Sequence, residues 1–169
     1  RWLGHDQVAV MDGCWERWQK EGRTETTEVP TVASRPFTAQ VRSHTITDVA
    51  HVDSVKEDAS YRLVDARAAA RFRGEVEPID PIAGHIPGAV CAAFEENIGP
   101  NGLMKSQEEL RERFRGIIGD MDTSQVICYC GSGVSACHNL LALLHAGLGD
   151  AKLYPGSWSE WITDPSRPV

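Results

Sequence analysis

The chain has 169 residues, of which 41% are hydrophobic, and its net charge is −7 at neutral pH. This length suffices for the buried core of one domain of ordinary size. The negative charge argues against a nucleic-acid partner, which would need a basic stripe. No apolar run approaches the ~20 residues that cross a bilayer, so we expect no membrane span.

The five cysteines are an odd number, and their spacing matches neither a disulfide framework nor a zinc site. We therefore expect a reducing compartment, the cytoplasm, with no metal and no other cofactor. Cys91 and Cys128 stand in apolar surroundings and are interpreted as small core residues. No signal peptide is apparent, and because the first residue is not methionine we expect a processed chain or a fragment.

Two short stretches of the chain resemble each other. Residues 8–18 and 151–161 each read as a short strand, a glycine turn and a helix start with two tryptophans three residues apart. The first tryptophans of the two pairs, Trp15 and Trp158, are 143 residues apart, about one domain length. The pattern predicts a tandem duplication in which residues 1–21 are the tail of a first copy, and it places both tryptophan pairs in cores.

Residues 22–36 are polar and proline-containing and are predicted to form a linker. Beyond it, strand-like and helix-like patterns alternate: strand 37–41, helix 47–55, strand 61–65, helix 66–72, acidic loop 74–84, a short strand ending segment 85–92, helix 107–115 capped by Ser106 with Glu109, strand 125–128, helix 136–146, and a final strand and turn. This alternation predicts that residues 37–169 form an α/β domain, with a mostly parallel sheet and helices on both faces.

A cysteine lies where the strand 125–128 gives way to the following helix, in the run Cys130-Gly131-Ser132-Gly133-Val134-Ser135-Ala136. Ligands of parallel sheets bind at the carboxyl ends of the strands. Loop N–H groups and the helix N-terminus favour a thiolate, which is the reactive form of cysteine. A cysteine phosphatase would need an arginine at position 136 to clamp phosphate, so this class is disfavoured. The alternative is a buried structural cysteine in a glycine-rich turn.

Other polar residues of the loop have two readings each. Ser132 and Ser135 could donate to an anionic sulfur or leaving group, or satisfy backbone groups near the helix start. Cys137 could resolve an oxidised Cys130 as a disulfide, although its helical direction favours burial against the sheet.

Three arginines cluster after the strand 61–65. Arg67 and Arg71 share a helical face, and with Arg73 they either reach an anionic substrate or form a solvated basic face beside the acidic loop. His85 lies between turn residues and is interpreted as a structural hydrogen-bonding group rather than an acid or base.

Taken together, five motifs resemble the C-terminal, catalytic rhodanese domain of the two-domain sulfurtransferases. In chain order they are Asp65-Ala66-Arg67, Arg71-Phe72, Gly84-His85-Ile86-Pro87-Gly88-Ala89, the run from Cys130 to Ala136, and Gly156-Ser157-Trp158-Ser159-Glu160-Trp161. The resemblance covers about residues 37–169, and residues 1–21 look like the end of the inactive N-terminal domain.

The resemblance implies that Cys130 takes a sulfur from a small donor as a persulfide and passes it to a thiol or to cyanide. It assigns proton handling to Ser132 and binding of the donor carboxylate to Arg71. It places the remaining loop residues around the substrate: Gly131, Gly133, Val134, Ser135 and Ala136. The loop resembles that of 3-mercaptopyruvate sulfurtransferases, since thiosulfate-preferring members carry bulkier, basic residues there.

The chain departs from this family pattern in three places. A second carboxylate-binding arginine would fall at Asp80, the Asp and His that assist the serine belong to the N-terminal domain, and Cys14 replaces a usual glycine. The resemblance implies that the substrate cleft lies between the two domains, so we expect it to need the N-terminal domain or another chain as partner. We expect residues 1–36 either to dock on the catalytic domain or to mediate association between chains. Thiosulfate preference, or an idle rhodanese module acting in binding or regulation, remain the alternatives.

Overall fold

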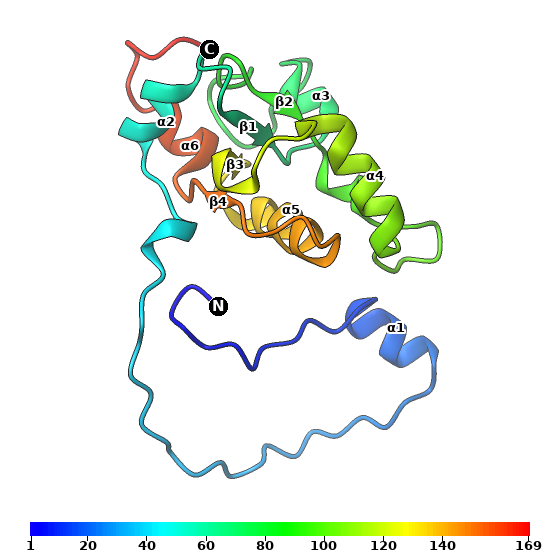
Figure 1. Ribbon diagram of the computed structural model, residues 1–169. Helices are drawn as coiled ribbons and strands as arrows, with labels where there is room; N and C mark the ends of the chain where they lie inside the picture. The colour runs from blue at the N-terminus through cyan, green and yellow to red at the C-terminus, as the bar shows by residue number, and fades with distance from the viewer.

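A four-stranded, all-parallel sheet forms the centre of the computed structural model, which describes residues 1–169 (Figure 1). Its strands run in the order β2-β1-β3-β4, and their bounds are β1 Arg62–Asp65, β2 Val90–Cys91, β3 Val126–Tyr129 and β4 Lys152–Leu153. Both inner strands are almost completely buried, as expected when helices cover both faces of a parallel sheet. The predicted fold class is confirmed.

Alternate strand residues feed two separate cores. Val64 and Cys128 face one core, whereas Leu63 and Ile127 face the other, because successive side chains of a strand point to opposite faces. The first core packs under α4 (Gln107–Ile118) and α5 (Val134–His145), and the second under α2 (Val49–Val55) and α6 (Ser157–Trp161). Helices thus lie on both faces of the sheet (Figure 1).

The remaining helical segments are short: α1 Cys14–Lys20, α3 Ala69–Phe72, and the 3-10 turns Ser43–Thr45, Phe94–Asn97 and Thr123–Gln125. The helix caps follow the local sequence. Asp48 accepts a hydrogen bond from the His51 N–H, and Ser106 and Glu109 form the predicted capping box. Each cap satisfies N–H groups that a helix start leaves without an intrahelical partner.

Two predicted elements differ from the structure. The predicted strand 37–41 does not form, because Gln40 and Arg42 donate their N–H groups to the carbonyls of Leu3 and Trp2 instead of joining the sheet. The predicted helix 66–72 begins only at residue 69. The backbone before it still follows the sheet, since the Ala66 N–H donates to the Tyr129 carbonyl.

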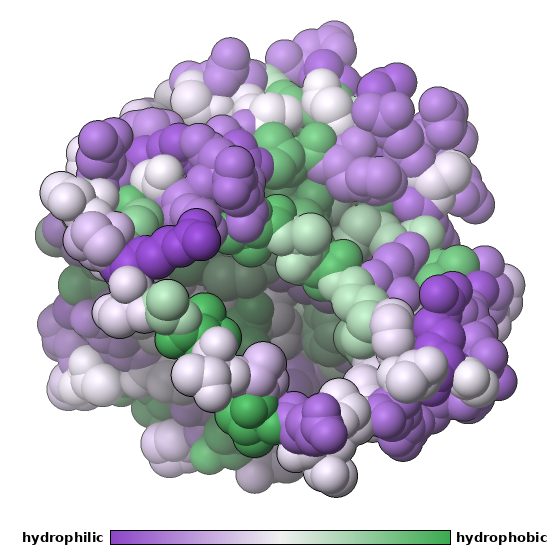
Figure 2. Space-filling model, turned by 90° about the horizontal axis from the view of Figure 1, so that it is seen from below, coloured by the Kyte–Doolittle hydropathy of each residue, from purple (hydrophilic) through white to green (hydrophobic).

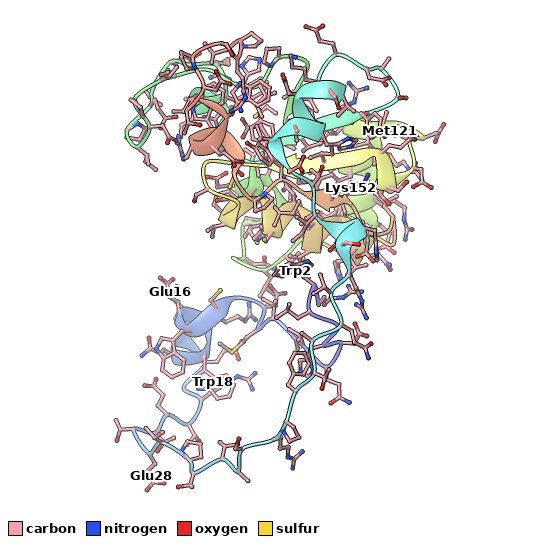
Figure 3. The ribbon with its side chains drawn as sticks, turned by 90° about the vertical axis from the view of Figure 1, so that its left-hand side faces the viewer. Trp2, Glu16, Trp18, Glu28, Met121 and Lys152 are labelled. Atoms are coloured by element: carbon pink, nitrogen blue, oxygen red, sulfur yellow. The ribbon has the colours of Figure 1, made fainter.

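Residues 1–42, here called the N-terminal arm, form an extended loop that stands away from the α/β domain (Figures 1 and 3). Few hydrogen bonds join the N-terminal arm to the domain. In one of them the Met104 N–H donates to the Asp12 carboxylate at 2.9 Å. Trp15 is 51% exposed and Trp18 is half-buried, so the prediction that this pair is core is wrong here, whereas Trp158 and Trp161 are fully buried as predicted. Seen from below, apolar side chains gather around the hollow that the arm encloses (Figure 2).

None of the helices has the length and apolar character that crossing a membrane would require. Nor do three or more His, Cys, Asp or Glu side chains gather where they could hold a metal ion.

Candidate active site

Cys130 directly follows β3 at the carboxyl edge of the sheet, and its side chain is almost completely enclosed, with 2% of the residue exposed. Residues at the start of α6 form hydrogen bonds with both the N–H and the carbonyl of Cys130. The Cys130 N–H donates to Ser157 Oγ at 3.1 Å, and its carbonyl accepts from the Trp158 N–H at 3.0 Å. The Gly131 carbonyl accepts from the Ser159 N–H at 2.9 Å. Three bonds from one short helix therefore set the position of the predicted nucleophile.

The cysteine loop, residues 130–136, rises from this floor to the surface and returns into α5. Ser132 and Val134 are exposed at its rim, Gly131 and Ser135 are half-buried, and Ala136 is buried under the helix. The predicted site residues are thus brought together by a single loop, with the Ser132 hydroxyl on the solvent side.

A glycine is required at position 133, where the loop turns into the helix. Its φ is +81°, and a Cβ there would stand 2.8 Å from the Pro155 carbonyl oxygen. This close approach packs the loop against the segment that leads into α6.

Several backbone N–H groups of the cysteine loop have no backbone acceptor. None of the N–H groups of residues 131–133 is bonded to a backbone carbonyl, and the first turn of α5 adds N–H groups that have no intrahelical partner. With the partially positive helix N-terminus, they are suited to an anionic sulfur held on Cys130.

Arg71 is the predicted substrate-binding residue, and its guanidinium lies 3.7 Å from the point where a Gly131 Cβ would stand. The structure pairs it with two carboxylates: Glu77 at 2.6 Å and Asp80 at 3.3 Å. Asp80 also accepts the Ser159 hydroxyl at 2.7 Å. The arginine stands beside the cysteine loop, and its charge is already compensated by acidic residues of the loop 74–84.

Ionisation of Glu77 is favoured inside this cluster. Burial of its carboxyl opposes the charged form, but hydrogen bonds from Arg71 and from the backbone N–H groups of residues 80 and 79 outweigh that cost. The pKa of Glu77 therefore lies below its usual value.

The other two arginines have structural roles. Arg67 is buried, binds Asp65 at 2.7 Å and lies over the Trp158 ring at 4.9 Å. Arg73 is exposed and pairs with Glu75. Of the three arginines whose roles the sequence left open, only Arg71 adjoins the cysteine loop.

The structure also places His85 and the other cysteines. His85 has structural contacts, as predicted: its ring stacks on Phe72, and its Nδ1 is hydrogen-bonded to the Phe72 carbonyl oxygen at 2.8 Å. Cys137 is exposed, so its predicted burial against the sheet is wrong: the sheet-facing stripe of α5 runs through Ala136 and Asn139, and Cys137 lies off it. Cys128 is buried as predicted.

Two thiols near Cys130 are disfavoured as thiolates. Burial raises the pKa of Cys128 to about 12. Cys137 is exposed as a residue, but its sulfur donates to the Gly133 carbonyl at 3.3 Å, and the atoms around the sulfur desolvate it and raise its pKa, with a smaller contribution from Cys130. Cys91, also predicted to be a core residue, is half-buried, and burial raises its pKa too.

Sequence reasoning missed Ser157, Ser159 and Glu77, the residues that fix the loop and its arginine. Ser157 is fully buried with φ +55°, an uncommon backbone conformation for a serine. No periodicity marks these positions; only the motif that contains the two serines could have pointed to them.

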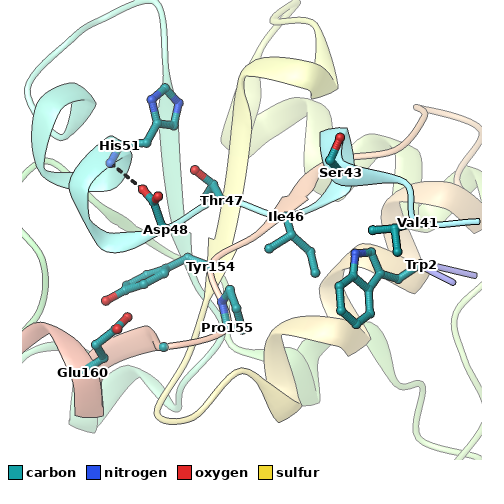
Figure 4. Close-up of a pocket in the computed structure, with 11 residues that line it drawn as sticks. Trp2, Val41, Ser43, Ile46, Thr47, Asp48, His51, Tyr154, Pro155 and Glu160 are labelled. Atoms are coloured by element: carbon teal, nitrogen blue, oxygen red, sulfur yellow. Dashed lines mark hydrogen bonds between the residues drawn. The ribbon is translucent and has the colours of Figure 1, made fainter.

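Two cavities between the N-terminal arm and the domain lie away from Cys130. One of about 540 Å³ is bounded by Trp2 and Val41 of the arm, by Tyr154, and by Glu160 of α6 (Figure 4). Another, of about 350 Å³, is lined by Trp2 and by Cys137 with the leucines of α5. Cys130 lines neither.

Comparison with known proteins agrees with this geometry. Residues 48–164 match the rhodanese-like domain model. The chain is 46% identical over 169 residues to a probable 3-mercaptopyruvate sulfurtransferase of Pseudomonas aeruginosa, and 36% identical over 163 residues to the human 3-mercaptopyruvate sulfurtransferase. These alignments cover 99% and 95% of this chain, but only 60% and 54% of the relatives.

Among solved structures, the anaerobic ergothioneine biosynthesis enzyme from Chlorobium limicola, in complex with trimethyl histidine, superposes with a TM-score of 0.87 at 23% identity. That match covers 99% of this chain and 42% of the enzyme, and it concerns the fold alone. The parallel sheet, the cysteine loop at its carboxyl edge and the matched residues 48–164 together show that this chain belongs to the rhodanese family.

Proposed function

We propose that this chain is the catalytic part of a sulfurtransferase that uses 3-mercaptopyruvate as donor. The observation that carries the proposal is the cysteine loop. Cys130 lies at the carboxyl end of β3 and is followed by unbonded backbone N–H groups and by the start of α5. The relatives named 3-mercaptopyruvate sulfurtransferase support the same chemistry.

In this mechanism the Cys130 thiolate attacks the sulfur of the donor, the C–S bond breaks, and its electron pair leaves on pyruvate as the enolate. The exposed Ser132 hydroxyl, at the rim of the loop, is placed to pass the proton that converts the enolate to pyruvate. The acceptor, a thiolate or cyanide, then attacks the outer sulfur of the persulfide. The S–S bond breaks and Cys130 is released as a thiolate.

The donor carboxylate is assigned to Arg71, beside Gly131. Thiosulfate is the alternative donor, and it differs by carrying two negative charges. The absence of basic side chains from residues 131–136 favours the donor with one negative charge. An idle rhodanese module would have no reason to retain this cysteine and its fastening bonds.

We further propose that residues 1–21 are the end of a first rhodanese-like domain, joined by the linker 22–36 to the catalytic domain 37–169. Cys14 and Ser157 occupy matching positions of the two similar stretches, and their φ values are +56° and +55°. The following tryptophans differ in burial: Trp15 is half exposed and Trp158 is buried. Ten of the fifteen exposed large apolar side chains lie in residues 1–41, which fits a partner domain or chain.

Limited proteolysis tests whether the arm docks. Slow cleavage within residues 1–36 is expected if it packs on the domain or on a second chain, and rapid cleavage throughout would contradict docking.

The five free thiols suit a reducing compartment, and we propose the cytoplasm.

Thiocyanate formation from cyanide, with 3-mercaptopyruvate and thiosulfate compared side by side, tests the activity. We expect a clear preference for 3-mercaptopyruvate. Cys130→Ser should abolish both turnover and the mass increase of one sulfur atom on the protein. Cys137→Ser is the matched control, expected to stay within a few-fold of the unmodified chain. A reactive Cys130→Ser variant would refute the mechanism.

A further inference from the structure

Asp80 is a carboxylate beside Arg71, the residue to which the donor carboxylate is assigned, and the structure gives it two partners. Oδ2 faces Arg71 Nη2 at 3.3 Å, and Oδ1 accepts the Ser159 hydroxyl at 2.7 Å. Its side chain is 8% exposed, so both contacts are shielded from solvent. Asp80 is therefore a buried link rather than a surface charge.

Both partners of Asp80 reach the residue that follows the nucleophile. The Ser159 N–H donates to the Gly131 carbonyl at 2.9 Å, and the Arg71 guanidinium nitrogens lie 3.7 Å from the point where a Gly131 Cβ would stand. Gly131, Ser159, Asp80 and Arg71 thus form a closed ring of contacts beside Cys130. A change at Asp80 acts on the cysteine loop through two routes.

The charges in this region do not cancel. Arg71 shares Glu77 and Asp80, and the buried Arg67 shares Glu77 with Asp65. Three carboxylates and two guanidinium groups leave one formal negative charge next to the loop. Glu77 accepts from two nitrogens of the Arg71 guanidinium, Nη2 at 2.6 Å and Nε at 3.1 Å, and Asp80 also accepts from Nη2. The remaining nitrogen, Nη1, has no acidic partner.

From this ring we propose that Asp80 is a specificity-determining residue, which holds Arg71 against Gly131 and disfavours donors that carry two negative charges. The inference rests on the proposed sulfur transfer and adds to it the reason for a donor preference. A dianion is repelled by the surplus charge twice as strongly as a monoanion, while Arg71 still offers one free N–H edge to a single carboxylate. An arginine at this position would have the opposite effect.

The test compares Asp80→Asn with two other variants. Asp80→Glu keeps the charge, and Glu75→Gln removes an equal charge from an exposed residue of the same loop, paired with Arg73. In Asp80→Asn, the ratio of kcat/KM for thiosulfate to kcat/KM for 3-mercaptopyruvate should rise about threefold. Thiosulfate carries one more negative charge than 3-mercaptopyruvate, and the repulsion of that extra charge by the Asp80 carboxylate lowers kcat/KM by roughly this factor. The other two variants should keep the ratio of the unmodified chain. A purely structural role would lower both kcat/KM values and leave their ratio unchanged, which would overturn the proposal.

A second measurement does not depend on turnover. The alkylation rate of Cys130 is followed by peptide mass spectrometry with iodoacetate, an anion, and iodoacetamide, which is neutral. Asp80→Asn should raise the iodoacetate-to-iodoacetamide ratio about threefold, and Glu75→Gln should not. If the unmodified chain turned over neither donor, the proposed function would fail, and this ratio would still decide the role of Asp80. An unchanged ratio in Asp80→Asn would refute it.

Discussion

Removing the Ser157 hydroxyl should weaken the fold at the point where α6 holds Cys130. Ser157 is fully buried; its Oγ accepts the Cys130 N–H at 3.1 Å and donates to the Tyr154 carbonyl oxygen at 2.9 Å. In Ser157→Ala, the buried Cys130 N–H loses its acceptor and the Tyr154 carbonyl loses a donor. A buried polar group without a partner costs about 1–3 kcal/mol, and a lost neutral hydrogen bond about 1 kcal/mol.

We therefore expect Ser157→Ala to lower the free energy of unfolding by about 2–3 kcal/mol, and Tm by roughly 5–10 °C. Urea unfolding followed by circular dichroism measures the first quantity and calorimetry the second. Because the loop is then held by fewer bonds, Cys130 should also react faster with iodoacetamide than in the unmodified chain.

Ser54→Ala is the matched control. Its hydroxyl also donates to the carbonyl three residues earlier, that of His51 at 2.7 Å, but it is exposed and holds no second group. Its loss should change stability by less than about 0.5 kcal/mol. If Ser157→Ala also changed the free energy of unfolding by less than about 0.5 kcal/mol, the claim that Ser157 holds the cysteine loop in place would be refuted.

Two further predictions concern packing and pH. Gly88→Ala should cost about 3 kcal/mol or more in urea unfolding, because φ is +78° and the new methyl group would collide with the Lys56 carbonyl oxygen. Gly116→Ala, in the last turn of α4 where a Cβ meets no other atom, should instead stabilise by about 0.5–1 kcal/mol. Equal effects of the two substitutions would contradict the steric reason. The folded-state pKa of Glu77 is lowered, so its contribution is present above the unfolded pKa of about 4.3 and is lost as pH falls through the folded value. Glu77→Gln should then lose less stability than the unmodified chain as urea midpoints are followed from about pH 6 to about pH 3, and parallel curves would refute the assigned bonds with Arg71.

Local sequence was enough to predict the architecture and the place of Cys130, the proposed nucleophile. The alternation of β and α patterns, the capping box at Ser106 and the cysteine after a buried strand all depend on residues close together in the chain. A short buried strand followed by a glycine turn and a helix leaves Cys130 few positions other than the carboxyl edge of the sheet. The site's loop could therefore be predicted without knowledge of long-range contacts.

Tertiary structure decided which groups surround that loop. Arg71 is paired with Glu77 and Asp80, and Asp80 is held in turn by the hydroxyl of Ser159, which is 79 residues further along the chain than Asp80. The exposure of Cys137 depends on the rotation of α5 on the sheet, and the missing strand at 37–41 on carbonyls of residues 2 and 3.

The difference between these two groups has a physical cause. Helix and strand patterns report the burial of a face, which neighbours in sequence share. Ion pairs and buried hydrogen bonds require two groups to meet at about 3 Å, and only the packing of distant segments brings them there. For this reason the sequence by itself determined the fold and the place of Cys130, while the charged groups beside the cysteine loop were set only by the packing of α6 against the loop 74–84.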